Sequence, residues 1–119
     1  MEKIIVYGIP NCDIIKKTLG WFKKNNIHVE FHDYKNSGIA KEKLTDWIKK
    51  AGLELILNKR STTWRELPVI EQEKITDDTA AIKLMMKNTS IIKRPVIESG
   101  DKILVGYDEA AFKKLLHGQ

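Results

Sequence analysis

The sequence predicts an α/β protein with a mixed four-stranded sheet, built from a βαβ half and a ββα half with a helical insertion between them. Three observations lead to this prediction. A strand, helix and strand pattern fills residues 3–33, helical patterns fill about 40–88, and a hairpin pattern followed by a helix comes after Pro95. With 119 residues, 42% of them hydrophobic, we expect a single domain over residues 1–119.

The first half begins with a short β-branched and aromatic run at residues 3–7, which predicts a buried strand. Residues 8–11 are turn formers, and Asn11 is expected to cap a helix that starts at Cys12. Its apolar positions recur at i, i+4 and i+7, which are Ile15, Leu19 and Phe22. The alternating run at 28–33 then predicts a second strand, parallel to the first.

The remaining elements follow in the same way. Residues 40–52 carry an apolar helical stripe that ends at a glycine, and 53–75 predict short helices and turns. A further helix is expected after Thr76, with acidic residues at its positive end. Residues 96–105 predict a hairpin around a Gly-containing turn, and Asp108 is expected to cap the last helix.

A βαβ unit and a ββα unit on one sheet form the plan of the thioredoxin-like fold. In that plan, the loop that carries Cys12 converges with the proline that opens the third strand, here Pro95. We expect the peptide bond before Pro95 to be cis. The backbone groups beside Arg94 are then expected to hydrogen-bond an extended, peptide-like ligand by strand addition.

Composition excludes several classes of protein. The chain has one cysteine, so an internal disulfide framework and zinc sites built on cysteine pairs are excluded. His28 and His32 lie too far apart on a strand to share a metal ion, so we expect no metal site. The net charge of +5 comes from scattered lysines without interleaved aromatics, so direct nucleic-acid binding is not expected.

Localisation is also an expectation from composition. No apolar run approaches the ~18 residues of a membrane span, and the first apolar run breaks at Gly8 and Pro10, too early for a signal peptide. We therefore expect a cytoplasmic monomer that does not bind membranes.

Five stretches together resemble one family. They are Tyr-Gly-Ile-Pro-Asn-Cys-Asp at 7–13, Phe-His-Asp-Tyr at 31–34, Leu-Asn-Lys-Arg-Ser-Thr-Thr-Trp-Arg at 57–65, Lys-Ile-Thr-Asp at 74–77 and Ile-Ile-Lys-Arg-Pro at 91–95. In order and spacing they resemble the arsenate-reductase-related (ArsC/Spx) family of thioredoxin-fold proteins, with the greatest similarity to its YffB-like branch. The resemblance covers the chain up to about residue 107.

The candidate catalytic residue is Cys12. A helix N-terminus stabilises a thiolate, which is the reactive form, while the neighbouring Asp13 opposes it. Dithiol oxidoreductases carry a second cysteine three residues later, where this chain has Ile15, so the mechanism is expected to be monothiol. Glutathione is the expected cosubstrate, with no bound cofactor, and glutaredoxin is a further candidate partner. The alternative is that Cys12 is a small buried apolar residue.

Two arginines complete the candidate site. In a chain with 18 lysines and 3 arginines, Arg60 and Arg94 are notable because a guanidinium binds a carboxylate or oxyanion through two hydrogen bonds. The resemblance implies that both approach the cysteine and hold the anionic substrate, with Asn11 and Pro95 in the same site. Pairing with a surface carboxylate or capping of a helix is the alternative for each arginine.

The sequence also departs from the arsenate reductases. Those enzymes have Gly-Thr-Ser-Arg after the cysteine, a histidine four residues before it and a third arginine after the last strand. Here those positions hold Asp-Ile-Ile-Lys at 13–16, Gly8 and Gly-Tyr at 106–107. A glutathione-linked thiol reaction needs fewer of these groups. True arsenate reduction and an Spx-like regulator that binds RNA polymerase remain as alternatives.

Overall fold

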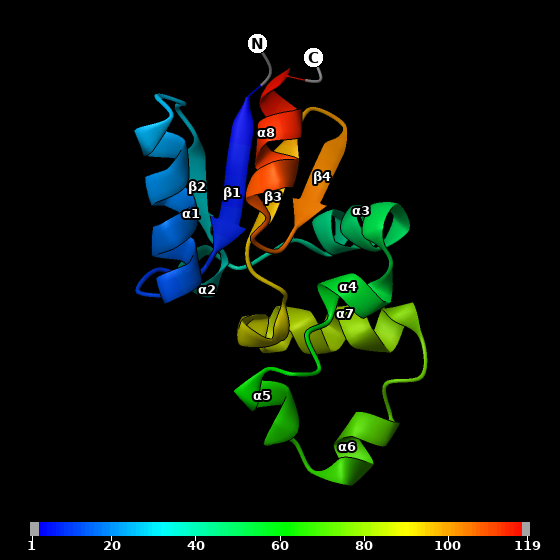
Figure 1. The fold of residues 1–119 in the computed structure, drawn as a ribbon. Coiled ribbons are helices and arrows are strands. Elements are labelled where there is room, and N and C mark those ends of the chain that lie inside the picture. The colour runs from blue at the N-terminus through cyan, green and yellow to red at the C-terminus, as the bar shows by residue number, and fades with distance from the viewer. Residues whose placement is uncertain (1–2, 118–119) are drawn as a thin grey trace. The chain divides into compact units, whose positions relative to one another are not determined.

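The computed structural model describes residues 3–117, which fold as two compact units (Figure 1). Unit 1 comprises the described residues 3–33 and 94–117, and unit 2 comprises Tyr34–Lys93. The elements are β1 (Ile4–Gly8), α1 (Asp13–Lys24), β2 (Glu30–Asp33), α2 (Tyr34–Ser37), α3 (Lys41–Ala51), α4 (Leu53–Ile56), α5 (Thr62–Arg65), α6 (Val69–Glu73), α7 (Asp78–Lys87), the 3₁₀ helix η1 (Thr89–Ile91), β3 (Val96–Ser99), β4 (Lys102–Val105) and α8 (Glu109–His117).

The sheet of unit 1 has four strands in the order β2-β1-β3-β4. Strand β1 is parallel to β2 and antiparallel to β3, and β3 is antiparallel to β4. The parallel pair is connected through α1, as the βαβ pattern predicts. The hairpin turns at Gly100, whose φ of 58° suits glycine, and the β3–β4 pair places Val96 opposite Val105. The thioredoxin-like fold class is confirmed.

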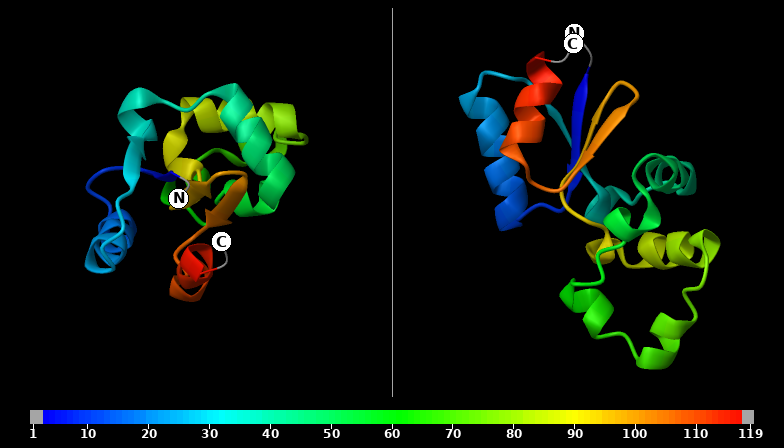
Figure 2. Two further views of the ribbon diagram at one scale, coloured as in Figure 1. Left: turned by 90° about the horizontal axis from the view of Figure 1, so that it is seen from above. Right: turned by 45° about the vertical axis from the view of Figure 1, so that its right-hand side comes forward.

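The hydrophobic core of unit 1 lies between the sheet and the two long helices α1 and α8, which cover the same face (Figure 2). Strand alternation directs Ile4 and Val6 of β1 to this face, together with Ile97 of β3. Phe22 of α1 and Phe112 of α8 pack on them, with ring centroids 5.3 Å apart. The opposite face therefore receives the alternate residues of β1, among them Tyr7.

Unit 2 is helical, and its α3 packs against α7. Its fully buried side chains include Tyr34, Leu44, Trp47, Ile56, Met85, Ile91 and Ile92. A short antiparallel pairing joins Leu57, in the middle of the unit, to Ile92 near its end. Asn58 N–H donates to the Ile91 carbonyl (2.8 Å), and Lys93 N–H donates to the Ile56 carbonyl (2.8 Å). The helical stretch expected at about 40–88 lies within this unit, and residues 53–75 form the short helices α4, α5 and α6.

Most expected caps are present. Asp77 accepts a hydrogen bond from Ala80 N–H at the start of α7 (2.8 Å), and Asp108 does the same for Ala111 in α8 (3.2 Å). Gly52 ends α3 with a φ of 92°, a conformation that favours glycine. The second strand is shorter than the predicted 28–33, because pairing with β1 starts only at Glu30.

Within residues 3–117 no helix has both the length and the apolar content needed to cross a membrane. The glycine expected to close the last helix, Gly118, lies outside the described residues.

Candidate functional site

Cys12 lies at the amino end of α1, one position earlier in the helix than the sequence predicts. It is itself the N-cap, with extended backbone (φ −124°, ψ 128°), and its carbonyl accepts from Lys16 N–H (2.9 Å). The prediction that Asn11 is the N-cap of this helix is therefore wrong. Asn11 instead adopts the left-handed conformation at φ 59°, which asparagine tolerates well, and its Oδ1 accepts from Lys16 Nζ (3.4 Å).

Cys12 is partly exposed rather than buried. No side chain caps the first turn of α1, so its backbone N–H groups remain directed at this end of the helix. A helix end of this kind favours a negative charge beside it. The N–H groups at this end of α1 are therefore available to a negatively charged group beside Cys12.

Gly8 and Ile15 form one packed contact beneath this loop. An added Cβ on Gly8 would lie 2.3 Å from Ile15 Cδ1 and 2.7 Å from Cγ1. Ile15 is only 2% exposed, so its side chain occupies the space that a larger residue at position 8 would need. Two of the departures from arsenate reductases, Gly8 in place of a histidine and Ile15 within 13–16, thus form one structural feature.

Arg94 and Pro95 enter the sheet at the same end as the Cys12 loop. Strand β1 ends at Gly8 as β3 begins at Val96, and Tyr7 lies directly opposite Val96. The Arg94–Pro95 peptide bond is cis, as predicted, and the Pro95 carbonyl accepts from Gly106 N–H (2.8 Å). Pro95 is buried and Arg94 is half-buried. The topology therefore brings Asn11, Cys12, Arg94 and Pro95 to one end of the sheet.

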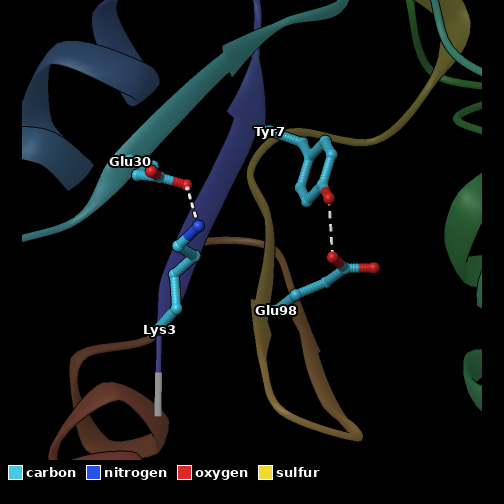
Figure 3. Close-up of polar contacts among 4 residues, drawn as sticks. All are labelled: Lys3, Tyr7, Glu30 and Glu98. Carbon is cyan, nitrogen blue, oxygen red and sulfur yellow. Dashed lines mark hydrogen bonds and ion pairs between the residues drawn. The ribbon is translucent and has the colours of Figure 1, made fainter. Parts of the chain in front are cut away.

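A buried polar pair lies on the sheet face opposite the α1–α8 core (Figure 3). The Tyr7 hydroxyl donates to Glu98 Oε1 at 2.6 Å, and Glu98 is only 8% exposed. Burial and this hydrogen bond both raise the pKa of Tyr7, because each disfavours the phenolate. Figure 3 also shows the exposed ion pair between Lys3, just before β1, and Glu30 of β2 (3.2 Å). Sequence reasoning did not find the Tyr7–Glu98 pair.

Arg60 belongs to unit 2, whereas Cys12 and Arg94 belong to unit 1. Arg60 is exposed and lines a basin of about 550 Å³ together with Lys59 and Lys93. Its backbone N–H donates to Asn58 Oδ1 (3.0 Å), which fixes the turn that carries it. Sequence reasoning singled out Arg60 for its guanidinium but missed the two lysines, although each is adjacent to a selected arginine in the sequence.

Comparison with known proteins identifies the relatives of this architecture. An uncharacterized protein of Haemophilus influenzae is 41% identical over 111 residues, covering 92% of this chain and 96% of its own. A solved YFFB protein is 38% identical, covers 93% of this chain and 96% of its own, and superposes with a TM-score of 0.88. The global transcriptional regulator Spx of Streptococcus pyogenes is 26% identical, covering 95% of this chain and 84% of its own.

The model of the ArsC family matches residues 7–115, a range that begins at Tyr7 before the cysteine loop and ends within α8. That range contains Cys12, Arg60 and the Arg94–Pro95 pair, so the predicted resemblance is confirmed over almost the whole chain. The chain belongs to the ArsC family.

Proposed function

We propose that the chain is a glutathione-dependent monothiol reductase with Cys12 as its nucleophile. The observation that carries this proposal is a partly exposed cysteine at the amino end of α1, at the end of the sheet where Arg94 and Pro95 precede β3. Ile15 supports a single-thiol reaction, because the position of a second cysteine is filled by a buried side chain.

The reaction has two thiol–disulfide exchanges. In the first, the Cys12 thiolate attacks one sulfur of a substrate disulfide; the new S–S bond forms as the old one breaks, and the leaving thiolate takes the electron pair and a proton. In the second, a glutathione thiolate attacks the mixed disulfide and releases Cys12 as a thiolate. The two exchanges at Cys12 leave a disulfide between glutathione and the substrate. A second glutathione thiolate attacks its glutathionyl sulfur and gives the substrate thiol and oxidised glutathione, so two molecules of glutathione supply the two electrons.

The arginines have binding roles in this proposal. Glutathione carries carboxylates, and a guanidinium binds a carboxylate through two charge-assisted hydrogen bonds. Arg94, which belongs to the same unit as Cys12, holds one carboxylate, while the anion-binding role of Arg60 in unit 2 stays a prediction from the family resemblance. Asn11 and Pro95 are assigned to the same site, and the peptide groups around Arg94 bind the extended tripeptide backbone.

The test is formation of the mixed disulfide. Incubated with oxidised glutathione, the wild-type chain should gain one glutathionyl group by intact mass, and Cys12→Ser should gain none. Arg94→Ala should slow adduct formation at least about tenfold, since a charge-assisted pair contributes about 1.5–3 kcal/mol. Arg65→Ala is the matched control, because Arg65 is an exposed arginine of α5 that the proposal does not use. Absence of an adduct on the wild-type chain rejects the proposal.

Two alternatives have specific support. The match to Spx raises a regulatory function through RNA polymerase, although that group typically uses a Cys-x-x-Cys switch and Ile15 occupies the second position here. Polymerase subunits retained equally by wild type and Cys12→Ser would favour it over the reductase. The ArsC family match raises arsenate reduction, which an assay with arsenate, glutathione and glutaredoxin decides. The Ile15 side chain over Gly8 leaves no room for the histidine of those enzymes.

A further inference from the structure

The basin of unit 2 is lined by both apolar and cationic residues. Its volume of about 550 Å³ lies in the range of small-molecule sites, about 300–1,000 Å³. Leu53, Leu55 and Leu57 are among its lining residues, and Lys59, Arg60 and Lys93 supply positive charge. All of these residues belong to unit 2, so the basin is formed within one compact unit. We call it the basic basin.

Backbone hydrogen bonds fix the positions of the cationic residues. Asn58 organises the turn at Lys59 and Arg60: its side chain accepts from Arg60 N–H, and its carbonyl accepts from Ser61 N–H (3.1 Å). Lys93 is held beside this turn because its N–H donates to Ile56 (2.8 Å). The three charges therefore come from backbone that is already ordered, which reduces the entropy lost when a ligand binds.

The charge of the basic basin is not compensated. Three cations and one acid, Glu54, line it, so its net charge is +2. Ion pairs are formed by Lys3, Lys50 and Lys74, and among residues 3–116 none joins Lys59, Arg60 or Lys93 to a carboxylate. Lys59 Nζ lies 5.5 Å from the Trp64 ring centroid, a weak contact that leaves its charge in place. An anion in the basin would relieve this repulsion.

The apolar lining residues restrict the kind of anion that the basic basin can bind. Leu55 is 56% exposed, and covering it would be favourable by the hydrophobic effect. A bare inorganic anion would leave that surface wet, and a neutral apolar molecule would leave the three cations unpaired. We propose that the basic basin binds a small amphipathic anion, with an apolar body on the leucines and a carboxylate or phosphate head among Lys59, Arg60 and Lys93.

This proposal does not rest on the thiol reaction. Arg60 is shared between the two proposals, so the tests below change Lys93 and Leu55 instead. Binding measured in Cys12→Ser should equal that of the wild-type chain. The experiments can therefore reject either proposal independently of the other.

The experiment titrates the full chain with octanoate and octyl phosphate below their micelle concentrations, and follows binding by calorimetry and by amide chemical shifts. Shifts should concentrate at residues 53–60 and at Lys93. Acetate has the carboxylate without the long alkyl chain, and octanol has the alkyl chain without the negative charge. Each should bind at least about tenfold more weakly than octanoate. Stronger binding of either octanoate or octyl phosphate identifies the preferred head group.

The variants separate the two parts of the basin. Lys93→Gln should weaken octanoate about threefold to fivefold, and added salt should reduce this difference. Leu55→Asn should weaken it to a similar extent, and it should affect octanol as well. Lys49→Gln, an exposed lysine of α3 outside the basin, is the matched control and should bind normally. Equal binding of octanoate and octanol, unchanged binding in Lys93→Gln, or shifts away from residues 53–60 would overturn the proposal.

Discussion

Replacing Gly8 with alanine should destabilise the chain, although the same replacement at Gly20 should stabilise it. The new Cβ at position 8 would lie 2.3 Å from Ile15 Cδ1, whereas carbon atoms in contact prefer about 3.5–4.0 Å. Ile15 would have to retreat by more than about 1 Å, and at 2% exposure it has no free space to enter. An added Cβ at Gly20 meets nothing within 4 Å.

The magnitude follows from two opposing effects. Overpacking a core costs about 1–3 kcal/mol, and the smaller entropy of unfolded alanine returns about 0.4–1 kcal/mol. We therefore expect Gly8→Ala to lower the free energy of unfolding by about 1–2 kcal/mol. Gly20→Ala, in the exposed middle of α1, should raise it by about 0.5–1 kcal/mol because it removes only the helix penalty of glycine.

Urea unfolding monitored by circular dichroism measures both variants. With a slope of about 1–3 kcal/mol/M, the Gly8→Ala midpoint should fall by roughly 0.5–1 M. Ile15→Ala removes the atoms that collide, so the double variant should be more stable than the sum of the two single effects by about 1 kcal/mol or more. If Gly8→Ala unfolds at or above the wild-type midpoint, or if the two effects simply add, the packing argument is wrong.

Three further predictions concern hydrogen bonds. Tyr7→Phe should cost about 1–3 kcal/mol of unfolding free energy in urea, because the buried Glu98 carboxylate loses the 2.6 Å donor; an unchanged midpoint would contradict this. The hydrogen bond from Tyr107 to Glu109 raises the pKa of Tyr107 from 10.0 to about 12. Its contribution to stability should therefore be complete below about pH 10 and disappear as the pH rises through about 12, and Glu109→Gln should bring the ultraviolet titration of this phenol back toward 10.0, which an unshifted curve would refute. Asp77→Ala should cost about 1 kcal/mol by removing the α7 cap, whereas Asp77→Asn should retain most of it, and equal melting of the two variants would exclude a capping role.

The sequence predicted the elements well where their signals are local. The β-branched run before Gly8 and the apolar stripes of α1 and α3 each identify an element from one short window. The two halves of the sheet then follow from the order of the elements and the handedness of parallel connections. The short helices α4–α6 were predicted only as a group, because four or five residues cannot show a helical period.

The sequence predicted only part of the candidate site, because some of its features depend on contacts between residues that are distant in the sequence. Asparagine is favoured both at N-caps and in left-handed turns, so the sequence alone could not decide which role Asn11 takes. Gly8 and Ile15 were both recognised as departures from the arsenate reductases, but their mutual contact depends on how α1 packs on β1. The Tyr7–Glu98 pair joins residues 91 positions apart, which no periodic pattern could reveal.

The strand order has a consequence for synthesis on the ribosome. Strand β1 emerges first, but its neighbour β3 and the covering helix α8 come from the last quarter of the chain. Unit 2 is one continuous segment, Tyr34–Lys93, and can close before β3 exists. During that interval one edge of β1 lacks its native partner, and unpaired strand edges promote association between chains. The nascent polypeptide therefore has its greatest need of chaperone protection just before Val96 leaves the exit tunnel.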